Sequence, residues 1–256
     1  MTTYERRQSI VQLFQKQSGL RVADLAKALD VSKGTIRNDL DALEAEGLLT
    51  RVHGGAVLSR QPSQFDLLFL SRYHERAEAK STMARAAAVL VEDGDSILLD
   101  ASTTVYYLAQ ELLNCHYLRV MTNGIDVARL LAKDSTNTVI LLGGVVSSNG
   151  SSVTGSLSEQ IIRNLHVQKA FVSCSGFSLE RGLTDVHLSE AQLKSIGIAV
   201  AREVIALVDS SKIGKEDLTP FATIAQIAQL YTDSGISETW EMRLKNAGVT
   251  FTVCHA

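Results

Sequence analysis

The feature that most constrains this chain is the segment 32–56, in which an amphipathic helical pattern leads directly into a glycine turn. Ile36, Leu40 and Leu43 recur at the spacing that places apolar side chains on one face of a helix. Ser32 comes just before this pattern, where its side-chain oxygen can accept a backbone N–H of the first turn. The segment therefore begins with a helix that has one buried stripe and an outward face of basic and polar residues.

Elements with local signals surround this helix on both sides. The apolar residues of 10–14 and of 22–29 predict two earlier helices, the first ending before Ser18-Gly19. Gly47 supplies the stop for the helix that follows Ser32. The runs 48–52 and 56–58 then flank His53-Gly54-Gly55, and this predicts a hairpin in which the glycines adopt positive φ.

Three helices followed by a hairpin are typical of a winged helix that reads duplex DNA. Asn38 points almost opposite to Ile36, and Arg37 lies on its flank, so both can reach base edges in the major groove. Asn pairs best with adenine and Arg with guanine, each for about 1–3 kcal/mol of discrimination. We expect DNA contacts, to bases or to phosphates, from Lys33, Thr35, Arg37, Asn38, Arg51, His53 and Gly54. The alternative is an ordinary three-helix bundle with a solvated polar face.

The distribution of charge differs between the two parts of the chain. Residues 1–60 hold nine Lys and Arg against seven Asp and Glu, whereas the remainder holds sixteen against twenty-one. The net charges are therefore +2 and −5, which add to the −3 of the whole chain. An acidic remainder indicates that the C-terminal part does not itself coat DNA.

A polar stretch that includes Pro62 separates this part from a second domain of another class. We expect a winged helix over 1–58, a linker and connecting helix over 59–79, and a second domain over 80–256. Strands predicted in the second domain alternate with helices, which favours a doubly wound, mainly parallel α/β fold. The predicted strands are 96–99, 119–122, 138–142, 170–173, 204–208, 229–232 and 249–253, and the helices include 80–91, 105–113, 125–132 and 189–202.

Several functional classes receive no support from the sequence. No apolar run reaches the roughly 18 residues of a membrane span, and the N-terminus lacks a signal-peptide pattern, so we expect a cytoplasmic protein. Cys115, Cys174 and Cys254 are odd in number and far apart, which indicates neither disulfides nor zinc. We expect no metal, no cofactor and no catalytic residues.

Polar residues follow several predicted strands and indicate a binding site for a small anion. Asp100-Ala101-Ser102-Thr103-Thr104 opens a helix whose free N–H groups and hydroxyls suit a phosphate, although a merely well-capped helix is equally compatible. Asn123 and the pair Gly143-Gly144 also follow strands, at the edge where parallel sheets bind ligands. Glu190 and Lys194 are compatible with a surface helix pair, whereas Asp209 and Lys212 follow a strand and suit a phosphosugar better.

The motifs of both domains together resemble the DeoR family of bacterial sugar-metabolism regulators. The resemblance rests on Arg6-Arg7, on Thr35-Ile36-Arg37 with Asp39-Leu40, on Leu43-Glu44 with Gly47, and on Arg51 with His53-Gly54-Gly55-Ala56. Asn38 departs from the family, which often has a second arginine there. The resemblance implies a sensor domain similar to phosphosugar isomerases. Its implied effector site comprises Asp100, Ser102, Thr103, Thr104, Asn123, Gly143, Gly144, Lys194, Asp209 and Lys212.

The sequence thus leads to one main hypothesis and two alternatives. The main hypothesis is a repressor of a carbohydrate-utilisation operon, a dimer or tetramer that a phosphorylated sugar or sugar alcohol releases from double-stranded operator DNA. The first alternative is a phosphosugar isomerase-like enzyme with an accessory DNA-binding module, in which Asp100, Asp185, Glu190 or Asp209 could move a proton. The second is an interaction protein without a small ligand.

Overall fold

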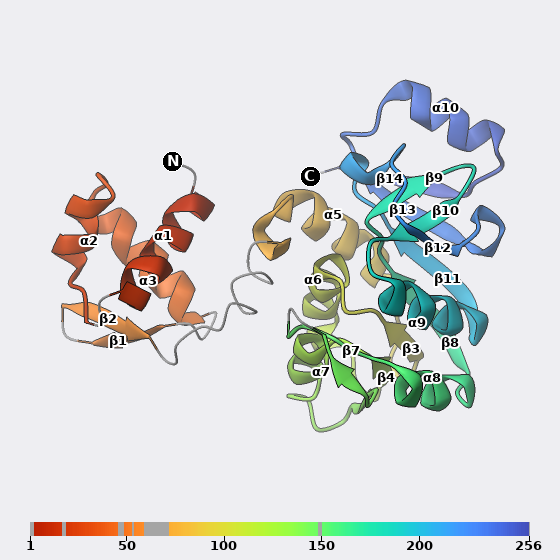
Figure 1. Cartoon of the computed structure of the whole chain (residues 1–256), viewed down its shortest axis with the longest axis horizontal. Coiled ribbons are helices and arrows are strands. Elements are labelled where there is room, and N and C mark those ends of the chain that lie inside the picture. The colour runs from red at the N-terminus through yellow and green to blue at the C-terminus, as the bar shows by residue number, and fades with distance from the viewer. Residues whose placement is uncertain are drawn as a thin grey trace. The chain divides into compact units, whose positions relative to one another are not determined.

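The computed structural model consists of two compact units, residues 1–74 and 75–256, and each is described by itself (Figure 1). It describes residues 3–16, 19–45, 49–52, 54–58, 72–147 and 150–255. Gly47 and His53 lie outside these ranges, so the helix stop predicted at Gly47 and the DNA contact predicted for His53 concern residues that are not described. Among the described helices, none combines the length and the apolar character needed to cross a bilayer.

The first unit has the predicted order of three helices and a hairpin. Its elements are α1 (Thr3–Lys16), α2 (Val22–Ala28), α3 (Lys33–Ala45), β1 (Leu49–Val52) and β2 (Gly55–Leu58). Ile36, Leu40 and Leu43 of α3 are buried and pack with Ile10 and Leu25 of the other two helices, which confirms the predicted stripe. The two strands pair antiparallel, with Val52 opposite Gly55.

The role predicted for Gly55 in the turn is wrong. Gly54 has a φ of +81°, as a turn glycine should, but Gly55 is the first residue of β2 and pairs with Val52. A Cβ on Gly55 would lie 2.3 Å from the carbonyl oxygen of Leu20. Glycine is therefore required at position 55 by the close approach of the hairpin to the start of α2, where Arg21 forms a bridge to Gly55.

A parallel sheet forms the centre of the second unit, as predicted. The described strands lie in the order β14-β13-β11-β8-β3-β4-β5, and each neighbouring pair is parallel. Their bounds are β3 (Ser96–Leu99), β4 (Arg119–Thr122), β5 (Thr138–Leu141), β8 (Val167–Val172), β11 (Ala201–Leu207), β13 (Gln229–Asp233) and β14 (Phe251–Cys254). The chain builds outward from β3 to β5 and then returns to β8 on the other side of β3.

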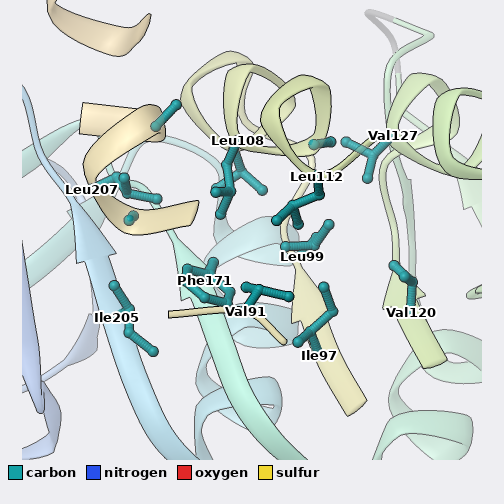
Figure 2. Packing of buried hydrophobic residues seen from close by; sticks show 14 of the residues in the cluster. Val91, Ile97, Leu99, Leu108, Leu112, Val120, Val127, Phe171, Ile205 and Leu207 are labelled. Carbon is teal, nitrogen blue, oxygen red and sulfur yellow. The ribbon is translucent and has the colours of Figure 1, made fainter. Parts of the chain in front are cut away.

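Helices cover both faces of this sheet, which makes it doubly wound. One face packs against α5 (Ala77–Ala88), α6 (Thr103–Glu111) and α7 (Ile125–Leu131). The other packs against α8 (Ser156–Arg163), α9 (Leu188–Ala199) and α10 (Glu238–Asn246). Figure 2 shows Ile97, Leu99 and Phe171 of the strands meeting Leu108 and Leu112 on the first face. Leu98 points to the opposite face, because successive side chains of a strand alternate.

Short antiparallel elements next to the main sheet were not predicted. These are β6 (Val145–Val146) with β7 (Val153–Thr154), and β9 (Gly176–Ser178) with β10 (Gly182–Asp185) and β12 (Thr219–Ala222). The helix predicted over 189–202 is also wrong at its end, since α9 stops at Ala199 and β11 starts at Ala201. Strands this short carry too little alternation to be recognised from sequence.

Candidate functional sites

The start of α3 is organised by Ser32, as its position suggested. The Ser32 hydroxyl accepts the backbone N–H of Thr35 at 3.1 Å and lies 2.8 Å from the Thr35 hydroxyl. Lys33, Arg37 and Asn38 are exposed on this helix. Three of the side chains predicted to reach DNA therefore face solvent, while the Thr35 hydroxyl has a local partner.

Asp39 joins the first helix to α3. Its carboxylate is buried and lies 2.5 Å from the Arg6 Nε and 3.2 Å from the Arg7 Nε. The sequence contained all three residues, but the helical pattern alone could not bring them together. The aspartate thus holds α3 against α1 and leaves its exposed face unobstructed by this contact.

Arg51 lies on the hairpin and is tied to α3. Its Nη1 atom is 3.2 Å from an Asp41 carboxylate oxygen, and its backbone N–H donates to Glu44 at 2.8 Å. The side chain is half-buried, whereas Gly54 at the turn is exposed. A phosphate that binds Arg51 would have to compete with Asp41.

The polar residues of the second unit gather where the sheet reverses its strand order, between β3 and β8. Asp100 follows β3 and Ser173 follows β8, and the Ser173 backbone N–H donates to Asp100 at 2.8 Å. Ligands of doubly wound sheets bind at such a reversal, because neighbouring loops separate there. The strand order therefore indicates the same edge as the predicted effector residues.

Lys194 forms the buried centre of this edge. Its Nζ atom lies 2.8 Å from the Ser173 carbonyl oxygen, 2.8 Å from Asp185 and 3.2 Å from Asp100. Burial by itself lowers the pKa of Lys194, but Asp100 and Asp185 raise it well above its ordinary value. The possible surface pair of Glu190 with Lys194 is wrong, since Lys194 is buried and its three donors meet other protein oxygens.

Burial and a neighbouring charge also oppose each other at the carboxyl group of Asp185. Burial raises the pKa of its carboxyl group, but Lys194 and the backbone N–H of His187 outweigh burial and lower it. Ser175 donates a further hydrogen bond to Asp185 at 3.2 Å. Asp185 is therefore held as a carboxylate beside the buried ammonium group.

Lys212 is the more accessible cation of this edge. Its Nζ atom lies 3.2 Å from the Ser173 hydroxyl and 3.2 Å from Asp209, and about a fifth of its side chain is exposed. Burial raises the pKa of Asp209, but Lys212, Ser211 and Arg76 outweigh burial and lower it. The Asp209 carboxylate thus stays ionised beside Lys212, which in turn lies next to Ser173.

The start of α6 is connected to this cluster through Asp100. The Ser102 hydroxyl accepts the Val105 backbone N–H at 3.1 Å, and the Ser102 N–H donates to Asp100 at 2.9 Å. Thr104 is buried, and its hydroxyl accepts from Ser173 at 3.4 Å. Thr103 is also buried. Ser102 therefore does cap the helix, and capping alone does not distinguish a phosphate site from a helix without ligand.

Asn123 and the glycine pair occupy the β4 and β5 side of the same edge. The Asn123 amide donates to Glu190 at 3.1 Å, and Ser152 also donates to Glu190. Gly143 accepts from the Ser158 hydroxyl through its carbonyl oxygen, and a Cβ at Gly143 would meet no atom within 4 Å. A Cβ at Gly144 would lie 2.4 Å from the Thr154 carbonyl oxygen. Gly144 is thus required by packing.

Four residues outside the predicted site join its members together. Ser173 contacts Asp100, Thr104, Lys194 and Lys212. Asp185 accepts from Lys194, and Glu190 accepts from both Asn123 and Ser152. Ser173 follows an apolar strand, as Asp100 and Asn123 do, so the same signal could have identified it. Ser152 follows no predicted element and carries no such signal.

Family models match both units. The model described as the DeoR-like helix-turn-helix domain matches residues 6–61, and the DeoR C terminal sensor domain matches residues 75–234. Ribose 5 phosphate isomerase A from Neisseria gonorrhoeae superposes with a TM-score of 0.39 at 12% identity, over 59% of this chain and 55% of that chain.

Curated relatives align along almost the whole chain. The HTH-type transcriptional regulator GolR of Listeria innocua is 36% identical over 97% of this chain and 98% of its own length. The lactose phosphotransferase system repressor of Streptococcus mutans is 36% identical over 91% of this chain and 93% of its own. A helix-turn-helix unit, a sensor unit and relatives of this identity establish that the chain belongs to the DeoR family of transcriptional regulators.

Proposed function

We propose that this protein represses a carbohydrate-utilisation operon and leaves its operator when a phosphorylated sugar or sugar alcohol binds the sensor unit. The observation that carries the proposal is the position of Lys212, partly exposed and next to Ser173 at the strand-order reversal. The relative named as a lactose phosphotransferase system repressor supports a carbohydrate operon.

The effector's phosphate is assigned to the start of α6 and to Lys212. Free N–H groups at a helix start favour an anion, and the Lys212 ammonium adds a full positive charge. Asp209 is suited to accept sugar hydroxyls. Lys194 is assigned a different role, because its donors already meet Ser173, Asp185 and Asp100. It positions Asp100 and leaves phosphate binding to Lys212.

Calorimetry with phosphorylated and free forms of one sugar tests this site. We expect the phosphorylated form to bind far more tightly, because the free sugar lacks the anion. Thr103→Ala should bind operator normally but resist release, and Lys212→Ala should lose the preference for the phosphorylated form. The exposed Lys133→Ala should behave like the wild type. To move the equilibrium between the operator-binding and released states from 99:1 to 1:99, the effector must bind the released state more tightly by about 5.5 kcal/mol. Equal affinity for both forms would exclude the phosphate site.

The DNA-contacting surface is assigned to the exposed face of α3 and to the hairpin. Arg37→Ala and Asn38→Ala should each weaken operator binding by about 1–3 kcal/mol while the fold persists. Arg51→Ala should weaken binding to all DNA similarly and reduce the salt slope by about one unit. The exposed Arg202→Ala of the sensor unit is the matched control. Unchanged operator affinity of Arg37→Ala at moderate salt would exclude this assignment.

An assembly of at least two copies completes the proposal. One winged helix offers a small interface, whereas two copies on a palindrome match the two-fold symmetry of the site. Sedimentation of the protein–operator complex should give two or four copies. A monomer that protects a single half-site would contradict this part.

The enzymatic alternative requires a base that is free to move a proton. Asp100 and Asp185 are paired with Lys194, and Asp209 is paired with Lys212, so these carboxylates are engaged. Glu190 accepts hydrogen bonds from Asn123 and Ser152. Incubation with phosphosugars in deuterated water separates the functions: a regulator should incorporate no deuterium at carbon, whereas an isomerase would.

A further inference from the structure

Arg76 lies at the first helix start of the sensor unit and has an unusual backbone. It is the residue before α5, and the first unit ends two positions earlier, at His74. Its φ of 55° and ψ of 36° place it in the left-handed region, where a side chain with a Cβ is strained. Such strain persists only where the surroundings hold the residue in place.

The side chain of Arg76 is held in place by residues at two strand ends of the sheet. Its Nη2 atom donates to the Ser210 hydroxyl at 2.7 Å and to Asp233 at 3.1 Å. Ser210 follows β11 and Asp233 ends β13, and the Ser210 N–H donates to Asp233 at 2.6 Å. The segment that enters the sensor unit is therefore bound to the carboxyl edge of the sheet.

Asp209 connects Arg76 with the proposed effector site. One of its carboxylate oxygens is 3.7 Å from the Arg76 Nε, and the other is 3.2 Å from the Lys212 Nζ. Two cations thus share one buried carboxylate. A phosphate that draws the Lys212 ammonium away leaves Arg76 as the remaining cation at Asp209.

We propose that Arg76 transmits effector binding from Asp209 to the segment that carries the DNA-binding unit. When Lys212 turns to the phosphate, the guanidinium moves toward Asp209 and loosens its contacts with Ser210 and Asp233. Because Arg76 sets the backbone turn before α5, this movement redirects the chain between His74 and Ala77. The inference rests on the proposed function and identifies Arg76 as a positioning residue, which itself touches neither effector nor DNA.

The test measures effector binding and operator release separately in the full chain. The probes are fructose 6-phosphate, ribose 5-phosphate and glucitol 6-phosphate, each followed by calorimetry and by release of labelled operator DNA. Arg76→Gln should bind the probe as the wild type does. The ratio of operator affinities without and with probe, typically about 5- to 150-fold for coupled sites, should fall close to 1.

Three further variants test whether the loss of coupling is specific to Arg76 and its contacts. Arg85→Gln changes an exposed arginine of α5 and should leave the ratio unchanged. Arg76→Lys keeps the charge but not the forked geometry, so it should restore part of the ratio. Asp233→Asn should lower the ratio of operator affinities although Arg76 itself is retained. Thermal unfolding verifies that each variant is folded.

The outcomes separate this inference from the proposed function. Release of Arg76→Gln and of the wild type by the same probe to the same extent would overturn the role of Arg76 and leave the repressor function intact. Loss of probe binding in Arg76→Gln would also overturn it, because the residue would then belong to the binding site. If no probe releases the wild-type protein, the proposed function fails, and the role of Arg76 fails with it.

Discussion

At the scale of single residues, the sensor unit depends on a buried ammonium group. Lys194 lies within 3.2 Å of Asp100 and Asp185, and both carboxylates are almost completely buried. Removal of one partner of such a cluster leaves the other charges without compensation in a medium of low dielectric constant. The cluster is therefore a site where one substitution affects the whole unit.

Lys194→Met is expected to destabilise the sensor unit by about 3–5 kcal/mol, as removal of one partner of a buried ion pair does. Urea unfolding measures this loss, and the exposed Lys245→Met of α10 should change stability little. A loss equal to that of the control would show that Lys194 does not compensate the two buried carboxylates.

The dependence of stability on pH follows from the same groups. The folded pKa values of Asp185 and Asp209 are lowered, so their contribution is present above the unfolded value of about 3.9 and declines as the pH falls through the folded values. The pKa of Lys194 is raised, so its contribution is present below about 10.4 and declines only at more alkaline pH.

Stability should therefore decline at acid pH. The slope of the free energy of unfolding against pH should be smaller in Asp185→Asn. Urea midpoints measured between about pH 3 and pH 7 test this, since that interval spans the unfolded value of Asp. The half-buried Asp217→Asn serves as a comparison of equal charge change. An unaltered acid slope in Asp185→Asn would show that other carboxylates control acid unfolding.

At the scale of elements, the hairpin of the first unit depends on two glycines for different reasons. Gly54 adopts a φ of +81°, whereas Gly55 lies against the Leu20 carbonyl at the start of α2. The Val22 N–H donates to the Gly54 carbonyl at 3.0 Å, so the turn and α2 are also joined by a backbone hydrogen bond. The hairpin is thus fixed to α2 as well as to α3.

Gly55→Ala should separate the hairpin from α2 and cost about 1–3 kcal/mol, as overpacking does. Gly54→Ala should cost about 1–2 kcal/mol through left-handed backbone strain alone. Gly54→Asn should lose less, because asparagine tolerates this region. Thermal unfolding and operator affinity measure both effects. A Gly55→Ala protein of wild-type stability would contradict the close approach.

At the scale of the whole molecule, the two units have separate hydrophobic cores. Ile36, Leu40 and Phe14 belong to the first core, and Leu99, Phe171 and Leu207 to one core of the second. Separate cores allow each unit to unfold in its own transition. A ligand that binds one unit should then stabilise that unit directly.

Calorimetry of the full chain should accordingly resolve two transitions. A sugar phosphate at 100 times its dissociation constant should stabilise the sensor unit by about 2.7 kcal/mol and shift its transition to a higher temperature. The transition of the DNA-binding unit should shift much less. Equal shifts of both would show that the two units unfold together.

The sequence by itself determined the elements with a strong local pattern. Both Ser96–Leu99 and Arg119–Thr122 match their observed strands residue for residue, and the stripe of α3 is buried as predicted. A continuous apolar run identifies each of these strands, and helical periodicity identifies the stripe of α3, because both signals lie within one short segment. The same pattern indicated the polar strand ends that gather at one edge of the sheet.

Only the tertiary structure decided which of those polar residues meet. Three contacts join residues from distant parts of the chain: Lys194 with Asp100, Ser173 with Asp100, and Arg76 with Asp233. The need for glycine at position 55 likewise arises from Leu20, which belongs to a different segment. Periodicity describes one element at a time, whereas these contacts depend on how the elements pack.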